Sequence, residues 1–232
     1  MQRKAIIIGA TGRVGQALVQ ELSSLYETVI VIARTPPKLM SKNMQFYALV
    51  DFENLQSTLS AIVLDDKTDA FCCLWAQSTN SEMLQKIHYK YPQQFAQLCY
   101  DKGVRSLFLL SKAGADVHAT NAVLQARGKL HQTLSAMPWQ HLLIFMVDKV
   151  ALAKELSLRG LGKRALYFAW QLLLADKPLT PTQIGVSMAL HAFYIHYQKY
   201  QSPSDKPPDA QRVEYISHKQ MLLMTEVLSA KR

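Results

Sequence analysis

The chain has 232 residues, 49% of them hydrophobic and 19% charged, and 26 Lys and Arg against 17 Asp and Glu give it a formal net charge of +9. This apolar fraction argues against wholesale disorder, and no apolar run is long enough to span a bilayer. The basic residues are spread along the chain without a nucleic-acid-binding motif, so we expect no nucleic acid and no membrane as partner. A few of them could serve a phosphate-bearing cofactor.

Two further features bear on the compartment. Only four apolar residues follow Lys4 before a glycine, which is too short for a signal peptide. The three cysteines, Cys72, Cys73 and Cys99, are odd in number and lack metal-ligand spacing, which favours reduced, buried thiols. We therefore expect a cytoplasmic protein without a metal site.

Apolar, β-branched runs alternate with helix-length amphipathic stretches over the first two thirds of the chain. The predicted strands are Ala5–Ile8, Thr28–Ala33, Gln45–Val50, Ala70–Leu74, Ser106–Leu110 and His141–Phe145. The predicted helices lie near Val14–Leu25, Leu55–Ile62, Glu82–Lys102 and Asn121–Met137. Strands that are apolar throughout and separated by helices indicate an α/β fold, with a doubly wound parallel sheet covered on both faces.

The pattern changes after about Val147. Long helical stretches follow near Gly162–Ala175 and Thr182–Tyr197, then the loop "YQSPSDKPPDAQR" and a short strand and helix in "VEYISHKQMLLMTEVL". We expect one domain over residues 1–150 and a small, mostly helical C-terminal lobe, residues 151–232, packed on it.

A glycine-punctuated turn, G-x-x-G-x-x-G, joins the first predicted strand to the first helix. Its first glycine permits a tight turn, its second lets a pyrophosphate approach the backbone, and its third lets helix and strand pack closely. The helix N-terminus then directs N–H groups and a positive dipole end at the phosphates. We expect a dinucleotide here rather than a purely structural turn, with contacts from Gly9, Thr11, Gly12, Arg13, Val14 and Gly15.

The end of the second strand bears on which dinucleotide is bound. NAD binders place an acid there for the ribose 2′-hydroxyl, whereas NADP binders use a basic residue for the 2′-phosphate. The stretch "VIVIARTPPK" has Arg34 at this point and no acid, and Arg13 could add a second charge. NADP(H) is therefore favoured over NAD(H). The alternative is that Arg34 is only a surface residue.

Several segments together resemble the NAD(P)H-binding subgroup of the atypical short-chain dehydrogenase/reductases. They are "IIIGATGRVGQALVQEL", "ARTPPKL", "ALVDFENL", "DAFCCLW", "GVRSLFLLSKAGAD" and "NAVLQARGKL". The resemblance covers about the first 150 residues and implies that they form a Rossmann-type NAD(P)-binding domain.

The resemblance also implies further contacts with the cofactor. Asp51 and Phe52 match a pair near the adenine, although Asp51 could equally be a helix N-cap. The segment Cys73, Leu74 and Trp75 would pass the adenine ribose and pyrophosphate. Relatives carry small residues where this chain has Trp75, and for Cys73 we favour core packing.

Catalysis is where the family pattern fails. Relatives use a Tyr-x-x-x-Lys pair, in which the tyrosine moves a proton at the substrate oxygen and the lysine holds the nicotinamide ribose. This chain has Val123 and Arg127 in those places. Valine cannot transfer a proton, and arginine does not titrate near neutral pH. Ser111 keeps the family's serine position, so Ser111 and Arg127 are the remaining candidates for a catalytic site.

The chain departs from the family pattern at further positions, and other residues could replace the missing acid or base. Lys112 replaces a second serine, and Phe145-Met146 replaces an Arg-Pro pair. His118 is the best replacement acid or base, although a loop histidine is more often solvated. Three tyrosines are weaker candidates, Tyr89, Tyr91 and Tyr100.

The sequence thus predicts an NADP(H)-binding protein without the Tyr-x-x-x-Lys pair, acting as a sensor or scaffold with little standard reductase activity. The alternative is an NADPH-dependent oxidoreductase or epimerase-like enzyme with a rearranged acid/base, acting on a small carbonyl or sugar-type substrate. The sequence names neither a substrate nor a protein partner.

Overall fold

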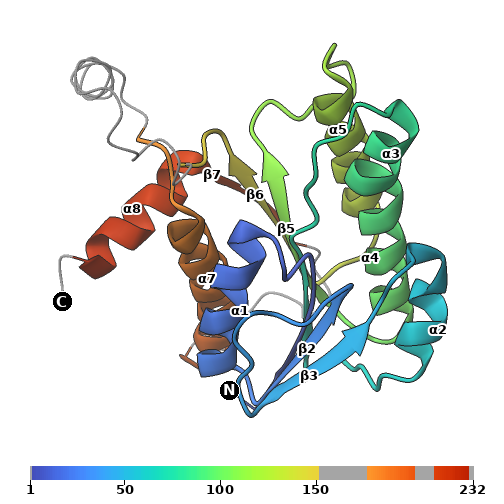
Figure 1. The fold of residues 1–232 in the computed structure, drawn as a ribbon. Helices are drawn as coiled ribbons and strands as arrows, with labels where there is room; N and C mark the ends of the chain where they lie inside the picture. The colour runs from blue at the N-terminus through green and yellow to red at the C-terminus, as the bar shows by residue number, and fades with distance from the viewer. Residues whose placement is uncertain (1, 152–176, 202–211, 230–232) are drawn as a thin grey trace.

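A computed structural model describes residues 2–151, 177–201 and 212–229. Its core is one parallel sheet of seven strands in the order β3-β2-β1-β4-β5-β6-β7 (Figure 1). The strands are β1 (Lys4–Ile8), β2 (Thr28–Ala33), β3 (Met44–Ala48), β4 (Thr68–Cys72), β5 (Ser106–Lys112), β6 (His141–Val147) and β7 (Arg212–Ser217). The order reverses between β1 and β4, which confirms the predicted doubly wound, Rossmann-type α/β fold.

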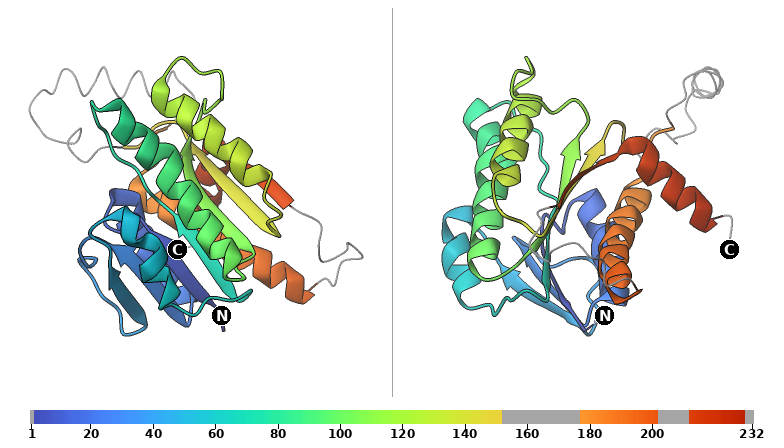
Figure 2. Two further views of the ribbon diagram at one scale, coloured as in Figure 1. Left: turned by 90° about the vertical axis from the view of Figure 1, so that its right-hand side faces the viewer. Right: turned by 180° about the vertical axis from the view of Figure 1, so that it is seen from behind.

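Helices cover both faces of the sheet (Figures 1 and 2). One face carries α1 (Arg13–Leu25), α7 (Pro181–Gln201) and α8 (His218–Ser229). The other carries η1 (Phe52–Asn54), α2 (Leu55–Ser60), α3 (Ser81–Gln85), the π-helical turn η2 (Lys86–Lys90), α4 (Tyr91–Asp101) and α5 (Ala122–Ser135). No helix in the described part of the chain combines the length and apolar character needed to cross a membrane.

Alternating strand residues supply the two cores, because successive side chains of a strand point to opposite faces. Ile7 packs into the core with Leu18 of α1 and Met188 of α7, whereas Ile6 belongs to the core with Leu55 of α2 and Leu130 of α5. All six side chains are completely buried. Strands that are apolar on both faces therefore match a sheet covered on both sides.

The C-terminal segments join the same sheet and layers. Gly185 lets α7 approach α1 closely, because a Cβ there would lie 2.8 Å from the backbone nitrogen of Leu18. The strand β7 pairs in parallel with β6 and extends the sheet. The helix expected near Gly162–Ala175 lies outside the described residues, and the division at residue 150 stays a prediction.

Several predicted boundaries differ from those in the structure. The fourth strand begins at Thr68, not Ala70, because it includes two polar residues that are buried. The predicted helix Glu82–Lys102 is divided into α3, η2 and α4.

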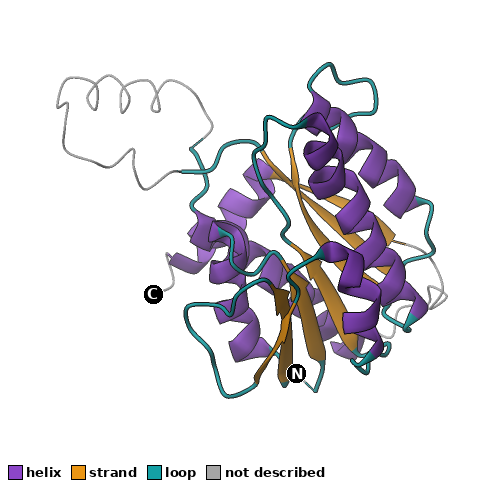
Figure 3. Cartoon of the chain, turned by 45° about the vertical axis from the view of Figure 1, so that its right-hand side comes forward, coloured by secondary structure: helices purple, strands orange, loops and turns teal. Residues whose placement is uncertain are grey.

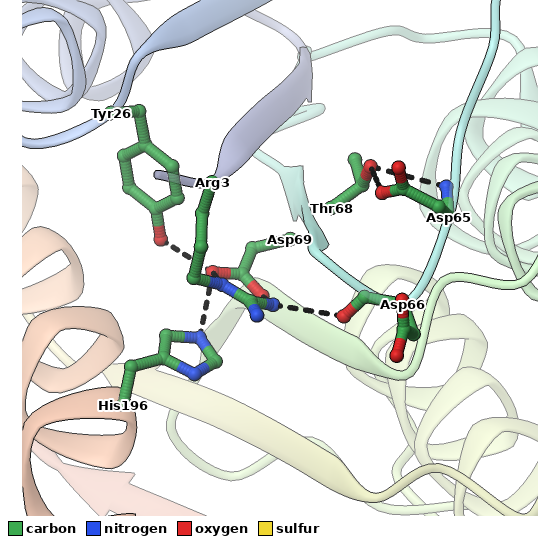
Figure 4. A network of polar contacts seen from close by, with 7 residues as sticks. All are labelled: Arg3, Tyr26, Asp65, Asp66, Thr68, Asp69 and His196. Atoms are coloured by element: carbon green, nitrogen blue, oxygen red, sulfur yellow. Dashed lines mark hydrogen bonds and ion pairs between the residues drawn. The ribbon is translucent and has the colours of Figure 1, made fainter. Parts of the chain in front are cut away.

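Asp69 is the centre of a buried polar network at the amino end of the sheet (Figure 4). Its carboxylate accepts hydrogen bonds from Tyr26 (2.7 Å), Arg3 (2.7 Å) and His196 of α7 (2.8 Å). Burial alone would raise the pKa of Asp69, but the contacts with His196 and Arg3 lower it overall. The network ties α7 to β4 at the edge opposite the glycine turn.

Candidate functional site

The candidate cofactor residues follow the carboxyl ends of neighbouring strands. Because all strands are parallel, these ends meet at one edge of the sheet, where doubly wound folds bind ligands. The loops can be followed in Figure 3, where they are teal. This edge carries the glycine turn after β1, Arg34 after β2, Asp51 after β3, Cys73 to Trp75 after β4, and Ser111 near the end of β5.

The three glycines of the turn play different roles. Gly9 has a φ of +79°, and a Cβ there would overlap the Cys73 carbonyl. A Cβ on Gly15 would overlap the carbonyl of Gly9. At Gly12, however, the nearest protein atom would lie 3.4 Å from a Cβ, and its φ of −70° suits any residue. Packing therefore demands Gly9 and Gly15, whereas the space beside Gly12 is left open.

The N-terminus of α1 is exposed beside Gly12. Gly12 is the N-cap residue and has no side chain to accept from the first turn, which also lacks an acidic residue. Arg13 and Val14 begin the helix, so their N–H groups have no intrahelical acceptor. Thr11, Gly12 and Arg13 are all exposed. Such a helix end has the polarity that favours a bound anion.

The ends of β2 and β3 differ in how far their polar residues are already engaged. Arg34 is exposed directly after β2. Asp51 caps η1, accepting a hydrogen bond from the Glu53 N–H at 3.1 Å, so its capping role is realised. The ring of Phe52 stacks on Tyr91 with ring centroids 4.2 Å apart.

The segment after β4 touches the glycine turn through its backbone. The Cys73 N–H donates to the Ile8 carbonyl at 3.0 Å. Burial raises the pKa of the Cys72 thiol to about 11 and that of Cys73 further still. Both thiols are therefore protonated at neutral pH and are poor nucleophiles.

Arg127 on α5 is completely buried and turned inward. Its guanidinium donates to the carbonyls of Leu74 and Leu110 (3.2 Å to Leu110) and to Nδ1 of His88 at 3.3 Å. Since Nδ1 of His88 accepts, its Nε2 carries the hydrogen that bonds the Ala76 carbonyl at 2.9 Å. Burial lowers the pKa of Arg127 to about 10, so the group remains a cation at neutral pH.

Trp75 lies over this buried cation. The guanidinium carbon of Arg127 is 5.2 Å from the indole centroid, within the range of a cation–π contact. The same indole meets the ring of His88 edge-on. Trp75 remains 42% exposed, so its aromatic surface is what this part of the edge presents.

A second histidine lies one turn further along α5. The Ser111 hydroxyl and Nε2 of His131 are 2.7 Å apart, and both residues are buried. Val123, Arg127 and His131 are spaced by four and so share one face of the helix. Burial and the charge of Arg127 lower the pKa of His131 to about 4. His131 was not among the residues predicted from the sequence, although its position four residues after Arg127 was a signal that could have identified it.

The other candidates lie apart from this pair. His118 is exposed, and its N–H donates to Asp116 at 2.7 Å. Lys112 donates to the Asp148 carbonyl at 3.1 Å. Tyr89 and Tyr100 pack against the core that contains Leu55 and Leu130. Within the described residues, no group of three His, Cys, Asp or Glu could hold a metal ion.

Comparison with known proteins shows which proteins the chain resembles in sequence. No protein-family model matches the chain. It is 27% identical over 152 residues to Protein HTATIP2 of Rattus norvegicus, a match that covers 62% of this chain and 62% of that protein. The chain thus spans less than two thirds of the length of this curated relative.

Solved structures share the fold. The oxidoreductase ylbE of Lactococcus lactis matches with a TM-score of 0.60 at 15% identity, covering 96% of this chain and 97% of that one. A putative NAD-dependent epimerase/dehydratase of Bacillus halodurans matches with a TM-score of 0.60 at 13% identity, covering 81% and 86%. The chain resembles the atypical short-chain dehydrogenase/reductases.

Val123 and Arg127 are the residues that the sequence analysis matched to the family's tyrosine and lysine, and this match stays a prediction. Val123 is partly buried at the start of α5. Arg127 points into the protein. The structure brings the glycine turn, Arg34 and the β4 end to one edge, and their roles in binding a short-chain dehydrogenase/reductase cofactor stay predictions.

Proposed function

We propose that this protein binds NADP(H) at the carboxyl edge of its sheet. The N–H groups of Arg13 and Val14 would hold the pyrophosphate beside Gly12, and Arg34, assisted by Arg13, would pair with the 2′-phosphate. The observation that carries the proposal is the open space at Gly12 beside an exposed helix N-terminus without a capping side chain. The protein's own packing gives no reason for a glycine there, whereas a pyrophosphate close to the backbone does.

The charge at the end of β2 supports the phosphorylated cofactor. Arg34 is exposed, and the segment from Thr28 to Lys38 contains no acid that would accept from a ribose 2′-hydroxyl. Asp51, at the neighbouring strand end, would lie near the adenine with Phe52. A cytoplasmic location, where NADP(H) is abundant, belongs to the same proposal.

The proposed role is that of a cofactor-binding sensor or scaffold with little standard reductase activity. Bound NADPH supplies a hydride donor. The chain's own residues provide no phenol at position 123, and each guanidinium nitrogen of Arg127 already donates a hydrogen bond, to His88, Leu110 or Leu74. Without a positioned proton donor, carbonyl reduction loses a contribution of about 10²–10⁴ in rate.

Replacing Arg34 tests the choice of cofactor. Wild-type protein should bind NADPH at least about tenfold more tightly than NADH, because a charge-assisted hydrogen bond contributes roughly 1.5–3 kcal/mol. Arg34→Ala should weaken NADPH binding about tenfold and leave NADH unchanged, as measured by titration calorimetry. Arg34→Lys should retain part of the preference.

A matched control separates this effect from net charge. Lys67 is exposed just before β4, at the opposite edge of the sheet, so Lys67→Ala removes the same charge without touching the site. It should leave both affinities unchanged. A wild-type protein that binds NADH as tightly as NADPH would show that Arg34 does not face a 2′-phosphate.

The pairing of Ser111 with His131 favours a second candidate function. A neutral histidine bonded to a serine hydroxyl at a strand end is an arrangement that could relay a proton. The protein would then be an NADPH-dependent oxidoreductase or epimerase-like enzyme, acting on a small carbonyl or sugar-type substrate. As a reductase it would require net, protein-dependent oxidation of NADPH, whereas as an epimerase it would convert a sugar-type substrate with no net change in the cofactor; the first candidate requires neither.

A further inference from the structure

We infer that this site recognises the 2′-phosphoadenosine and pyrophosphate half of its ligand and makes little use of the nicotinamide riboside. The ligand class is then a 2′-phosphorylated adenosine diphosphate carrying a ribose, whether or not a nicotinamide is attached. The inference rests on the proposed function and specifies which part of the ligand that site recognises.

The polar groups that are free to bind phosphates lie on one side of the proposed site. Thr11, Gly12 and Arg13 are exposed at the start of α1, and Arg34 is exposed after β2. These groups are available to phosphates without breaking any hydrogen bond described above. They lie at the β1–β2 side of the switch point, the side that takes the adenosine half in the proposed binding mode.

Val123 and Arg127 lie four residues apart on one face of α5. Val123 offers no hydrogen-bonding atom. Arg127 is fully buried, and each of its three guanidinium nitrogens already donates to an acceptor. Turning it out toward a ribose would leave two backbone carbonyls and a histidine nitrogen without this donor, and leaving buried polar groups unpaired is unfavourable.

Three further side chains lie near the carboxyl ends of β4 and β5. Ser111 and His131 are hydrogen-bonded to one another, and they are only 2% and 5% exposed, respectively. Trp75 covers the guanidinium with its ring and presents an aromatic face. An indole surface can contact a flat ring, but it fixes neither the ribose hydroxyls nor the carboxamide of a nicotinamide riboside.

Titration calorimetry with NADPH, NADP⁺, 2′-phospho-ADP-ribose and NADH tests the inference on the wild-type protein. The first three ligands should bind within fivefold of one another, and NADH more weakly than all of them. If 2′-phospho-ADP-ribose binds more than fivefold more weakly than NADPH, the nicotinamide riboside is recognised and the inference is wrong. If NADPH does not bind, or binds no better than NADH, the proposed function itself fails.

Arg127→Lys supplies a second readout that keeps the positive charge. Lysine lacks the planar fork that bonds two carbonyls and a histidine at once, so the thermal midpoint should fall. The ratio of the NADPH and 2′-phospho-ADP-ribose affinities should stay within fivefold of its wild-type value. A loss confined to NADPH would show that Arg127 reaches the riboside and would overturn the inference.

Discussion

Gly12→Val is expected to weaken NADPH binding by about a hundredfold or more and to leave the protein folded. The φ of −70° and ψ of 165° at Gly12 suit a valine, and a Cβ there meets no protein atom closer than 3.4 Å. The added branches would occupy the space through which a pyrophosphate approaches the helix N-terminus. A hundredfold loss corresponds to about 3 kcal/mol, the scale of several lost phosphate contacts.

The other two glycines of the turn provide the contrast. Gly15→Ala places a methyl group against the Gly9 carbonyl, and Gly9→Ala also requires an alanine at a φ of +79°. Both should lower the free energy of unfolding, measured in urea, whereas Gly12→Val should hardly change it. NADPH affinity is read by nicotinamide fluorescence. A folded Gly12→Val protein with wild-type affinity would remove the basis of the proposed site.

Acidification from pH 7.5 to pH 5 is expected to lower the free energy of unfolding by about 4 kcal/mol through two histidines. Burial, followed by the positive charge of Arg127, lowers the pKa of both His88 and His131 to about 4. In the unfolded chain both titrate near 6.5. Between these values the unfolded state binds protons that the folded state does not, so stability is full above pH 6.5 and falls as the pH drops, by about 2 kcal/mol per histidine.

Substitutions of single histidines test which residues cause this acid sensitivity. His131→Gln should remove about half of the pH dependence, while His118→Gln, a change at an exposed loop position, should leave it intact. Urea unfolding of each variant at pH 7.5, 6.25 and 5 measures the effect. A wild-type free energy of unfolding that is flat over this range would mean that the two histidines are not held neutral by the fold.

Much of the fold could be predicted because its signals are local. The uninterrupted apolar run of β2 gave the correct bounds, Thr28–Ala33, and the glycine turn placed the first helix within one residue. The start of β4 was missed because Asp69 is buried by partners far away in sequence, Arg3, Tyr26 and His196. A strand that begins with a buried carboxylate carries no local apolar signal.

The features of the site likewise divide into those that depend on local sequence and those that depend on distant residues. The positive φ of Gly9, the close packing at Gly15 and the capping by Asp51 follow from local geometry and were accessible to the sequence. The inward turn of Arg127 was not, because it depends on the carbonyls of Leu74 and Leu110 and on His88, which lie 17 to 53 residues away. Ser111 and His131 likewise meet only when α5 packs on the sheet.

One measurement tests the central claim that this protein binds NADPH without acting as a standard reductase. NADPH is titrated into the wild-type protein, and the saturated complex is mixed with a panel of aldehydes, ketones and keto sugars while absorbance at 340 nm is followed. We expect saturable binding and NADPH oxidation no faster than in protein-free controls. Brisk oxidation with any member of the panel would contradict it and would place the chemistry with the second candidate function.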